Sequence, residues 1–208
     1  MSDEAKNMVG KFLKAFWKAA HETEETFTCA LTGGSAAKLL YPELAKLDLE
    51  WKRVQFYLSD ERCVPSSSPD SNYKLIRDLI PMATVRRVRT ELKPYQAAAE
   101  YGGALPPQLD LVLLGMGEDG HVASLFPGHA LLTETKRKVV AITDSPKPPA
   151  ERITMTLPAL TGAKATWFVV VGEAKRAAAD AARNDPKSQL PAALVHRAAL
   201  SSTWFTDF

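Results

Sequence analysis

Cysteine is scarce in this sequence, because the chain of 208 residues holds only Cys29 and Cys63. Two cysteines cannot form the framework of disulfides that stabilises small secreted domains, and neither lies in a spacing typical of zinc sites. Long apolar runs are missing too, since the longest are only as long as a strand. The first 22 residues are charged throughout and lack the apolar core of a signal peptide. We therefore expect a cytoplasmic protein that does not enter a membrane.

Neither sign of charge is in clear excess, with 26 basic and 24 acidic side chains and a formal net charge of +2. Proteins that bind nucleic acids carry clustered positive charge to neutralise many phosphates. The one locally basic run, residues 86–89, is more simply an exposed strand edge. We expect no nucleic-acid partner. The length and the ordinary proportion of hydrophobic residues, 46%, favour a single domain over residues 1–208.

Strands alternate with helices along the chain. Apolar residues at helical spacing predict an opening amphipathic helix from residue 3 to about residue 21. Further strands are expected at residues 26–32, 53–58, 109–114 and 164–171, and further helices at 36–47, 72–80 and 173–184. This order predicts an α/β fold with a mostly parallel sheet and helices on both faces. Ligands of such sheets bind in the loops that follow the strands.

Three of these loops have unusual compositions. They are residues 32–35 (Thr-Gly-Gly-Ser), 59–65 (Ser-Asp-Glu-Arg-Cys-Val-Pro) and 115–121 (Gly-Met-Gly-Glu-Asp-Gly-His). Two other connections, residues 66–71 and 145–149, are rich in serine and proline and are expected to be exposed. Composition alone therefore places the candidate chemistry in the first three loops.

The loop of Gly33, Gly34 and Ser35 follows a strand and opens a helix. Unhindered backbone N–H groups at a helix N-terminus suit a phosphate, although the same residues also make an ordinary tight turn. In the second loop, Arg62 could make planar contact with a carboxylate or phosphate. Asp60 and Glu61 could hold that arginine or act on a substrate hydroxyl. The alternative is a surface ion pair.

The loop at residues 115–121 carries the strongest local signal. His121 arrives at the end of a buried strand, among three glycines and two residues after Asp119. Histidine is the side chain best suited to proton transfer near neutral pH. A dinucleotide fingerprint is disfavoured, because His121 takes the place of the third glycine of G-x-G-x-x-G.

Four segments together resemble the 6-phosphogluconolactonases, in order and with similar spacing. They are residues 31–35, 58–65 (Leu-Ser-Asp-Glu-Arg-Cys-Val-Pro), 71–72 (Ser-Asn) and 113–128, which includes Gly-Met-Gly-Glu-Asp-Gly-His-Val-Ala-Ser-Leu-Phe-Pro-Gly. Residues 152–156 and 172–175 are similar to the later phosphate-site segments of that family. The resemblance runs from about residue 31 to residue 175 and is most specific over 115–128. It implies a Rossmann-like α/β fold.

The resemblance also implies an activity, the hydrolysis of 6-phospho-D-glucono-1,5-lactone to 6-phosphogluconate in the oxidative pentose phosphate pathway. His121 is the implied general base, and Asp119 either orients its ring or serves only as a turn residue. Backbone N–H groups of the loop at residues 115–120 are candidates for the contact with the oxyanion. The expected substrate-binding residues are Gly33, Gly34, Ser35, Asp60, Arg62, Gly117, Arg152 and Lys175. We expect no cofactor, no metal and a monomer, with a weak homodimer as the alternative.

Some positions depart from the family pattern. Its glycine loop usually continues with Thr-Pro, whereas this chain has Ala36 and Ala37, and residues 194–208 match poorly. A related class, the amino-sugar phosphate deaminases, has a glutamate five positions after the histidine, where this chain has Phe126. A sugar-phosphate sensor without activity is a second alternative, but it would have no need of a base beside the carbonyl of its ligand.

Overall fold

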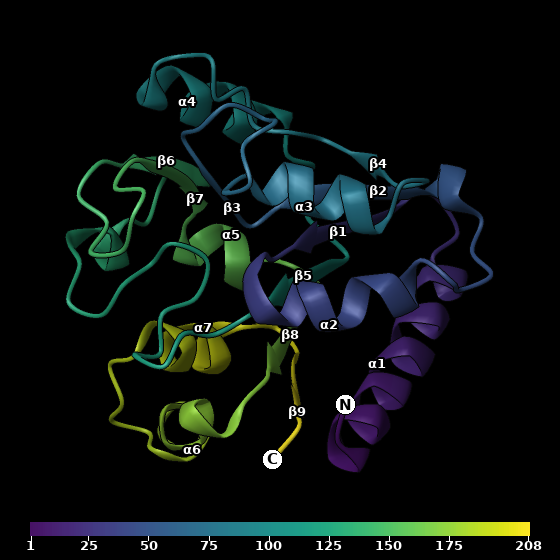
Figure 1. Ribbon diagram of the computed structural model, residues 1–208. Helices are drawn as coiled ribbons and strands as arrows, with labels where there is room; N and C mark the ends of the chain where they lie inside the picture. The colour runs from purple at the N-terminus through teal and green to yellow at the C-terminus, as the bar shows by residue number, and fades with distance from the viewer.

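Six parallel strands form the main sheet of the computed structural model, which describes residues 1–208 (Figure 1). Their order is β4-β2-β1-β5-β8-β9. The strands are β1 (Phe27–Leu31), β2 (Val54–Leu58), β4 (Thr84–Val85), β5 (Leu111–Leu114), β8 (Ala165–Val170) and β9 (Ser202–Thr206). Every residue of β5 is buried, as expected for a central strand covered on both faces. The mostly parallel α/β sheet predicted from the sequence is confirmed.

Helices cover both faces of this sheet. They are α1 (Asp3–Glu22), α2 (Gly34–Leu44), α3 (Asn72–Leu79), α5 (Leu157–Thr161), α6 (Arg176–Asn184) and α7 (Pro191–Ala198). Helix α4 (Pro94–Ala104) packs mainly on the smaller sheet described below. Helix α2 contacts both α1 and α3, whereas α7 contacts α5 and α6, so the two groups form separate layers (Figure 1). None of these helices has the length and apolar character needed to span a bilayer.

The chain reverses its direction across the sheet between β1 and β5. From β1 it proceeds through β2 to β4 at one edge, and from β5 it proceeds through β8 to β9 at the other. The loops after β1 and β5 therefore diverge and leave a crevice at the carboxyl ends of these strands. This topology places residues 32–35 beside residues 115–121.

A second, antiparallel sheet lies beyond the carboxyl end of β2 and was not predicted from the sequence. It consists of β3 (Asp60–Arg62), β7 (Arg152–Met155) and β6 (Val139–Ile142), in that order. Strand β3 pairs with β7 so that Arg62 lies opposite Arg152. The small sheet thus joins two segments that are far apart in sequence at the rim of the crevice.

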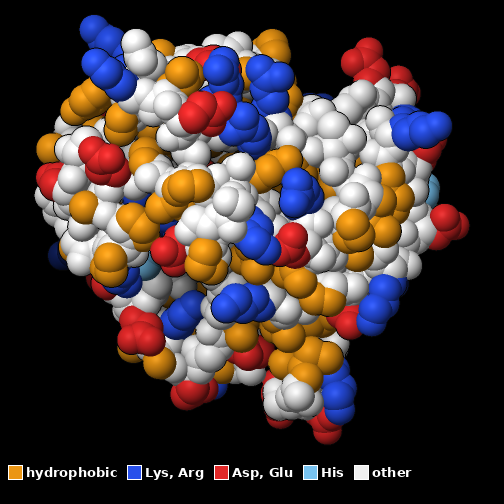
Figure 2. Space-filling model, turned by 45° about the horizontal axis from the view of Figure 1, so that its top comes forward, with side chains coloured by type: hydrophobic (Ala, Val, Ile, Leu, Met, Phe, Trp, Pro, Cys, Tyr) orange, Lys and Arg blue, Asp and Glu red, His pale blue; other side chains and the backbone are white.

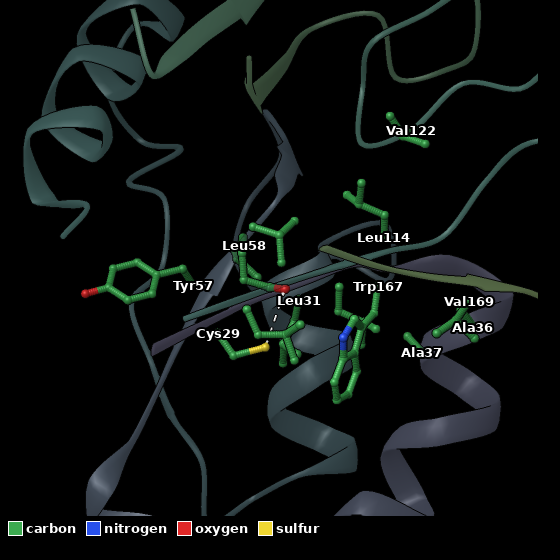
Figure 3. Close-up of a cluster of buried hydrophobic side chains, with 14 of the residues drawn as sticks. Cys29, Leu31, Ala36, Ala37, Tyr57, Leu58, Leu114, Val122, Trp167 and Val169 are labelled. Atoms are coloured by element: carbon green, nitrogen blue, oxygen red, sulfur yellow. Dashed lines mark hydrogen bonds between the residues drawn. The ribbon is translucent and has the colours of Figure 1, made fainter. Parts of the chain in front are cut away.

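Buried apolar side chains fix the points at which the loops leave the main sheet. Leu31, Leu58 and Leu114 end β1, β2 and β5, and each is no more than 1% exposed. Figure 3 shows them gathered in one cluster with Cys29 and Trp167. Because such close-packed interiors deform little, the three loops start from fixed positions.

The remaining sequence predictions differ from the structure mainly at the ends of elements. The helix expected at 36–47 begins at Gly34 and ends at Leu44. The helix expected at 173–184 opens with the 3₁₀ turn Glu173–Lys175 before α6 begins. Helices α4, α5 and α7 and strands β3, β4, β6, β7 and β9 were not predicted, and residues 86–89, expected to be a strand edge, follow the end of β4 and lie outside any strand. On the face shown in Figure 2, acidic and basic side chains are interspersed, in keeping with the balanced charge of the sequence.

Candidate active site

One polar pocket lies at the carboxyl edge of the main sheet, where the crevice between β1 and β5 opens. It is lined by Thr32, Gly33, Gly34, Ser35, Ala36, Asp60, Arg62, Asn72, Gly115, Met116, Gly117, His121, Ala123, Arg152 and Lys175. The structure therefore brings together nine of the ten site residues expected from the sequence. The tenth, Asp119, does not line the pocket but contacts the His121 ring through its carboxylate.

The loop after β1 forms one wall of the pocket at the N-terminus of α2. Gly33 is the N-cap of the helix, and a Cβ built on it would lie 2.0 Å from Oδ1 of Asn72, so only glycine fits there. Ser35 Oγ accepts a hydrogen bond from Lys175 Nζ over 3.2 Å. A helix N-terminus, a hydroxyl and an ammonium group therefore converge on one end of the pocket, a combination that suits an anion.

Lys175 reaches this place from the turn that follows β8. Gly172, with φ of 101°, begins the turn, and its N–H donates to the Asp207 carboxylate over 2.8 Å. Burial lowers the pKa of Lys175, and the carboxylates of Glu118 and Asp207 oppose this decrease. The Lys175 ammonium group, which has lost part of its hydration, would form an ion pair with a phosphate in the pocket.

The charged residues of β3 point in different directions. The Glu61 carboxylate, which is almost fully buried, accepts hydrogen bonds from the backbone N–H groups of Arg62, Asn72 and Tyr73 and from the Ser71 hydroxyl. Glu61 therefore caps α3 instead of facing the pocket, so it acts on no substrate hydroxyl.

Asp60 and Arg62 do line the pocket. Asp60 accepts a hydrogen bond from Ser124 Oγ over 2.7 Å and lies 3.3 Å from Asn72 Nδ2. Arg62 donates through Nη1 to the Asp70 carbonyl over 2.7 Å, while its buried Nε has no hydrogen-bond partner. The guanidinium is thus anchored at one nitrogen and retains donors for a ligand.

The loop after β5 presents His121 at the other end of the pocket. The loop closes on itself, because the Gly117 N–H donates to the His121 carbonyl over 2.9 Å and the Gly120 N–H donates to the Gly117 carbonyl over 3.0 Å. A Cβ on Gly117 would lie 2.1 Å from His121 Nδ1, so glycine is needed for the ring to lie where it does. The backbone N–H groups of Gly117 and Gly120 are therefore already used within the loop.

His121 and Asp119 form a close pair. Asp119 Oδ1 lies 2.5 Å from His121 Nδ1, and the His121 side chain is only 18% exposed. An ionised carboxylate can only accept hydrogen bonds, so Nδ1 carries the proton and Nε2 carries the lone pair. On its other side, the imidazole packs against the Phe126 ring, with 4.8 Å between the ring centroids.

The surroundings of His121 favour the neutral ring. Burial lowers the pKa of His121, and the charge of Lys147 lowers it further, whereas the hydrogen bond and the charge of Asp119 and the charge of Asp60 raise it. The net direction is downward. Burial raises the pKa of Asp119, but the hydrogen bond from His121 and the charges of His121 and Lys147 outweigh this effect and lower it. A neutral base is therefore paired with an ionised carboxylate at neutral pH.

Arg152 lines the pocket, but most of its donors are used elsewhere. Its Nε donates to the Pro149 carbonyl over 2.9 Å, and its Nη2 donates to the carbonyls of Lys147 and Pro148 over 2.9 and 3.0 Å. Its Nη1 lies 3.4 Å from Ser124 Oγ. Arg152 is 4% exposed, and of the five N–H hydrogens of a guanidinium one is left uncommitted.

Sequence reasoning assigned no role to several residues of this site. Asn72 was noted only within the Ser-Asn segment, and Ser124 only within the segment 113–128. Lys147 lies in the connection 145–149, which was expected to be merely exposed, although its Nζ is 3.4 Å from His121 Nδ1. The available signal was its basic side chain in an otherwise uncharged, proline-rich loop. No cluster of three or more His, Cys, Asp or Glu side chains is arranged to bind a metal ion.

Comparison with known proteins finds a family match over almost the whole chain. Residues 2–204 match the model of the glucosamine-6-phosphate isomerases/6-phosphogluconolactonase family, a longer stretch than the motifs at residues 31–175. The chain is 36% identical to 6-phosphogluconolactonase 3 of Saccharomyces cerevisiae over 223 residues, covering 97% of this chain and 90% of that protein. It is 40% identical to chloroplastic 6-phosphogluconolactonase 3 of Arabidopsis thaliana over 206 residues, covering 87% of this chain and 63% of that protein.

A solved structure shares the whole fold. The crystal structure of 6-phosphogluconolactonase from Thermotoga maritima superposes with a TM-score of 0.86 at 28% sequence identity. The match covers 99% of this chain and 95% of that one. The order of strands and helices described above is therefore that of a known enzyme fold.

Proposed function

Because the chain belongs to the glucosamine-6-phosphate isomerases/6-phosphogluconolactonase family, we propose that its pocket hydrolyses 6-phospho-D-glucono-1,5-lactone to 6-phosphogluconate. This reaction is the lactone-opening step of the oxidative pentose phosphate pathway. The observation that carries the proposal is the placement of the His121–Asp119 pair at one end of a pocket whose other end holds Lys175, Ser35 and the N-terminus of α2. A base and an anion site thus share one cavity.

His121 is the general base of the proposed reaction. Its Nε2 takes a proton from a water molecule whose oxygen forms a bond to the lactone carbonyl carbon. The imidazolium that forms is stabilised by the Asp119 carboxylate, which does not itself take up the proton. When the bond from that carbon to the ring oxygen breaks, Nε2 returns the proton to the leaving oxygen. The product is an open-chain hydroxy acid, and His121 is neutral again.

The oxyanion formed on the carbonyl oxygen needs hydrogen-bond donors. Since the N–H groups of Gly117 and Gly120 are used within the loop, we assign this contact to the start of the loop, at Gly115 and Met116, which both line the pocket. One such donor is worth about 2.7–4 kcal/mol in enzymes where it has been removed. The role of Gly117 is then to leave room for the His121 ring, because it has no Cβ.

The substrate phosphate is proposed to lie against Gly33, Gly34 and Ser35, where Lys175 adds its positive charge. Asp60 is proposed to accept a hydrogen bond from a sugar hydroxyl, and Arg62 to donate to the carboxylate of the product. Arg152 is proposed to contribute one N–H to the same ligand and otherwise to hold the neighbouring loop. The pocket has no need of a cofactor for this reaction, because water is the only co-substrate.

A deaminase function is disfavoured by Phe126, which occupies the position of the ring-opening glutamate. Its apolar ring is 2% exposed and lies between the His121 imidazole and the Arg152 guanidinium, whose carbon is 5.8 Å from the ring centroid. Phenylalanine offers no acid at this position to open a sugar ring. A catalytically silent sensor would not require the 2.5 Å contact between Asp119 and His121.

We further propose that residues 1–208 act as one domain and as a monomer in the cytoplasm. Support for the compartment comes from the two free thiols, since Cys29 is buried and Cys63 is half-buried and neither is in a disulfide. Size-exclusion chromatography with light scattering measures the oligomeric state.

The deciding experiment is a rate measurement with freshly prepared 6-phosphogluconolactone. The purified protein is expected to open the lactone well above its spontaneous rate, and to release no ammonia from glucosamine 6-phosphate. Ammonia release without lactonase activity would replace this proposal with the deaminase alternative. Binding of the sugar phosphate without turnover would favour the sensor.

A further inference from the structure

Lys147 is a charged residue that the proposed reaction does not use, although it lies beside the general base. It belongs to the connection between β6 and β7, and its Nζ is 3.4 Å from His121 Nδ1 and 3.5 Å from Asp119 Oδ1. Nδ1 already donates its proton to Asp119, so it has no lone pair to accept a hydrogen bond from the ammonium. Lys147 therefore donates to Asp119 and acts on the imidazole through its charge alone.

The position of Lys147 is fixed by its own main chain. The Lys147 carbonyl accepts hydrogen bonds from Arg152 Nη2 over 2.9 Å and from Ser145 Oγ over 2.8 Å. Arg152 also binds the carbonyls of Pro148 and Pro149, so a buried guanidinium holds three consecutive carbonyls of this loop. Because Arg152 opens β7, the small sheet determines where the Lys147 side chain leaves the backbone.

Besides burial, which lowers the pKa of His121 most, three charged groups influence that pKa. Asp119 comes from its own loop, Lys147 from the β6–β7 connection and Asp60 from β3. The two carboxylates favour the protonated ring, and Lys147 is the one cation among the three that opposes it. Without Lys147, the ring would face two negative charges and would retain a proton to a higher pH.

We propose that Lys147 is a positioning residue for the lactonase reaction, which holds Asp119 and keeps His121 unprotonated so that it can accept the proton of water. This inference rests on the proposed function. It assigns a function to the loop at residues 145–149. It also assigns a function to the hydrogen bonds from Arg152 to the carbonyls of that loop, which is to hold Lys147 beside Asp119. Its role is distinct from binding the substrate, because it acts through His121 and not through the phosphate.

The test compares the pH dependence of kcat/KM for the wild type and Lys147→Met, with the spontaneous rate subtracted at each pH. The acidic limb of the variant is expected to move to higher pH, so that kcat/KM on that limb falls about threefold to tenfold while the plateau changes by less than about twofold. Lys147→Arg retains the charge and is expected to restore the wild-type limb. Lys136→Met is the matched control, since it removes the same charge from an exposed side chain of the segment that precedes β6, away from the pocket.

An unchanged acidic limb in Lys147→Met would overturn the proposal. A loss that is equal at every pH and lies in KM would also overturn it, because it would mean that Lys147 holds the substrate anion. The titration of the His121 Cε1–H signal by NMR, identified by its absence in His121→Asn, measures the same shift without turnover. If the wild type is inactive on the lactone but this signal titrates at higher pH in Lys147→Met, the proposed function fails, and only the effect of Lys147 on the protonation of His121 stands.

Discussion

Asp119→Asn separates the two roles that the sequence left open for Asp119. Asparagine keeps the size and the turn-forming ability of aspartate, and its amide oxygen can still accept from the His121 backbone N–H, which lies 3.4 Å from Asp119 Oδ1. It loses only the negative charge beside Nδ1. If Asp119 serves merely as a turn residue, the variant should therefore behave like the wild type.

The expected loss follows from the 2.5 Å contact between Asp119 Oδ1 and His121 Nδ1. This contact becomes charge-assisted on both sides when His121 takes the proton of water, and hydrogen bonds to charged groups contribute about 1.5–3 kcal/mol. At 1.36 kcal/mol for each factor of ten in rate, kcat should fall about 10-fold to 150-fold. The Asp119 carboxylate also raises the pKa of His121, so the acidic limb of the variant should move to lower pH, opposite to the shift expected for Lys147→Met.

The assay is initial-rate kinetics of 6-phosphogluconolactone hydrolysis between about pH 5 and 8, with thermal unfolding to verify that the fold is retained. Asp48→Asn is the control, because it makes the same change at an exposed aspartate that does not line the pocket. A kcat within about twofold of the wild type, with an unshifted acidic limb, would refute the assignment of Asp119 as the partner of the base.

The remaining predictions concern the base and the far end of the pocket. His121→Asn should lower kcat by ~10²–10⁴-fold with an unchanged unfolding temperature, since it removes the general base; near-normal turnover would exclude His121 from the mechanism. Lys175→Ala should mainly raise KM for the phosphorylated lactone and leave the slow hydrolysis of unphosphorylated gluconolactone almost unaltered, because its partner is the phosphate. Arg152→Ala should slow both lactones and lower the unfolding temperature, because it releases the carbonyls of residues 147–149; an effect limited to the phosphorylated lactone would show that Arg152 acts as a phosphate ligand.

The central part of the site could be predicted because its determinants are local in sequence. A glycine pair between a strand and a helix, and a histidine among glycines after a buried strand, each specify their own loop geometry. The parallel sheet then brings the loops after β1 and β5 to one edge, since both strands point the same way. Gly33, Ser35 and His121 line one pocket for this reason.

The part that could not be predicted depends on pairing between distant segments. Strand β3 is only three residues long, and its partner β7 follows β5 and β6 in the sequence. No local sequence pattern therefore predicts the small sheet. Glu61 was similarly ambiguous, because a carboxylate beside an arginine is equally able to face a substrate or to cap a helix. Its four donors, three of them from residues 71–73, show that it caps α3.

Arg152 shows most clearly why a motif does not determine a role. Its place in the sequence suggests a phosphate ligand, and its side chain does reach the pocket. A buried guanidinium must satisfy its donors, however, and the nearest acceptors are the carbonyls of residues 147–149, which have no strand or helix to pair with. Satisfying them turns an exposed connection into a rigid support that places Lys147 beside Asp119. The anion end of the pocket is thus built from local loops, whereas the environment of the base depends on the small sheet. Substitutions at the anion end should therefore impair hydrolysis of the phosphorylated lactone alone, whereas substitutions around the base should slow the hydrolysis of both lactones.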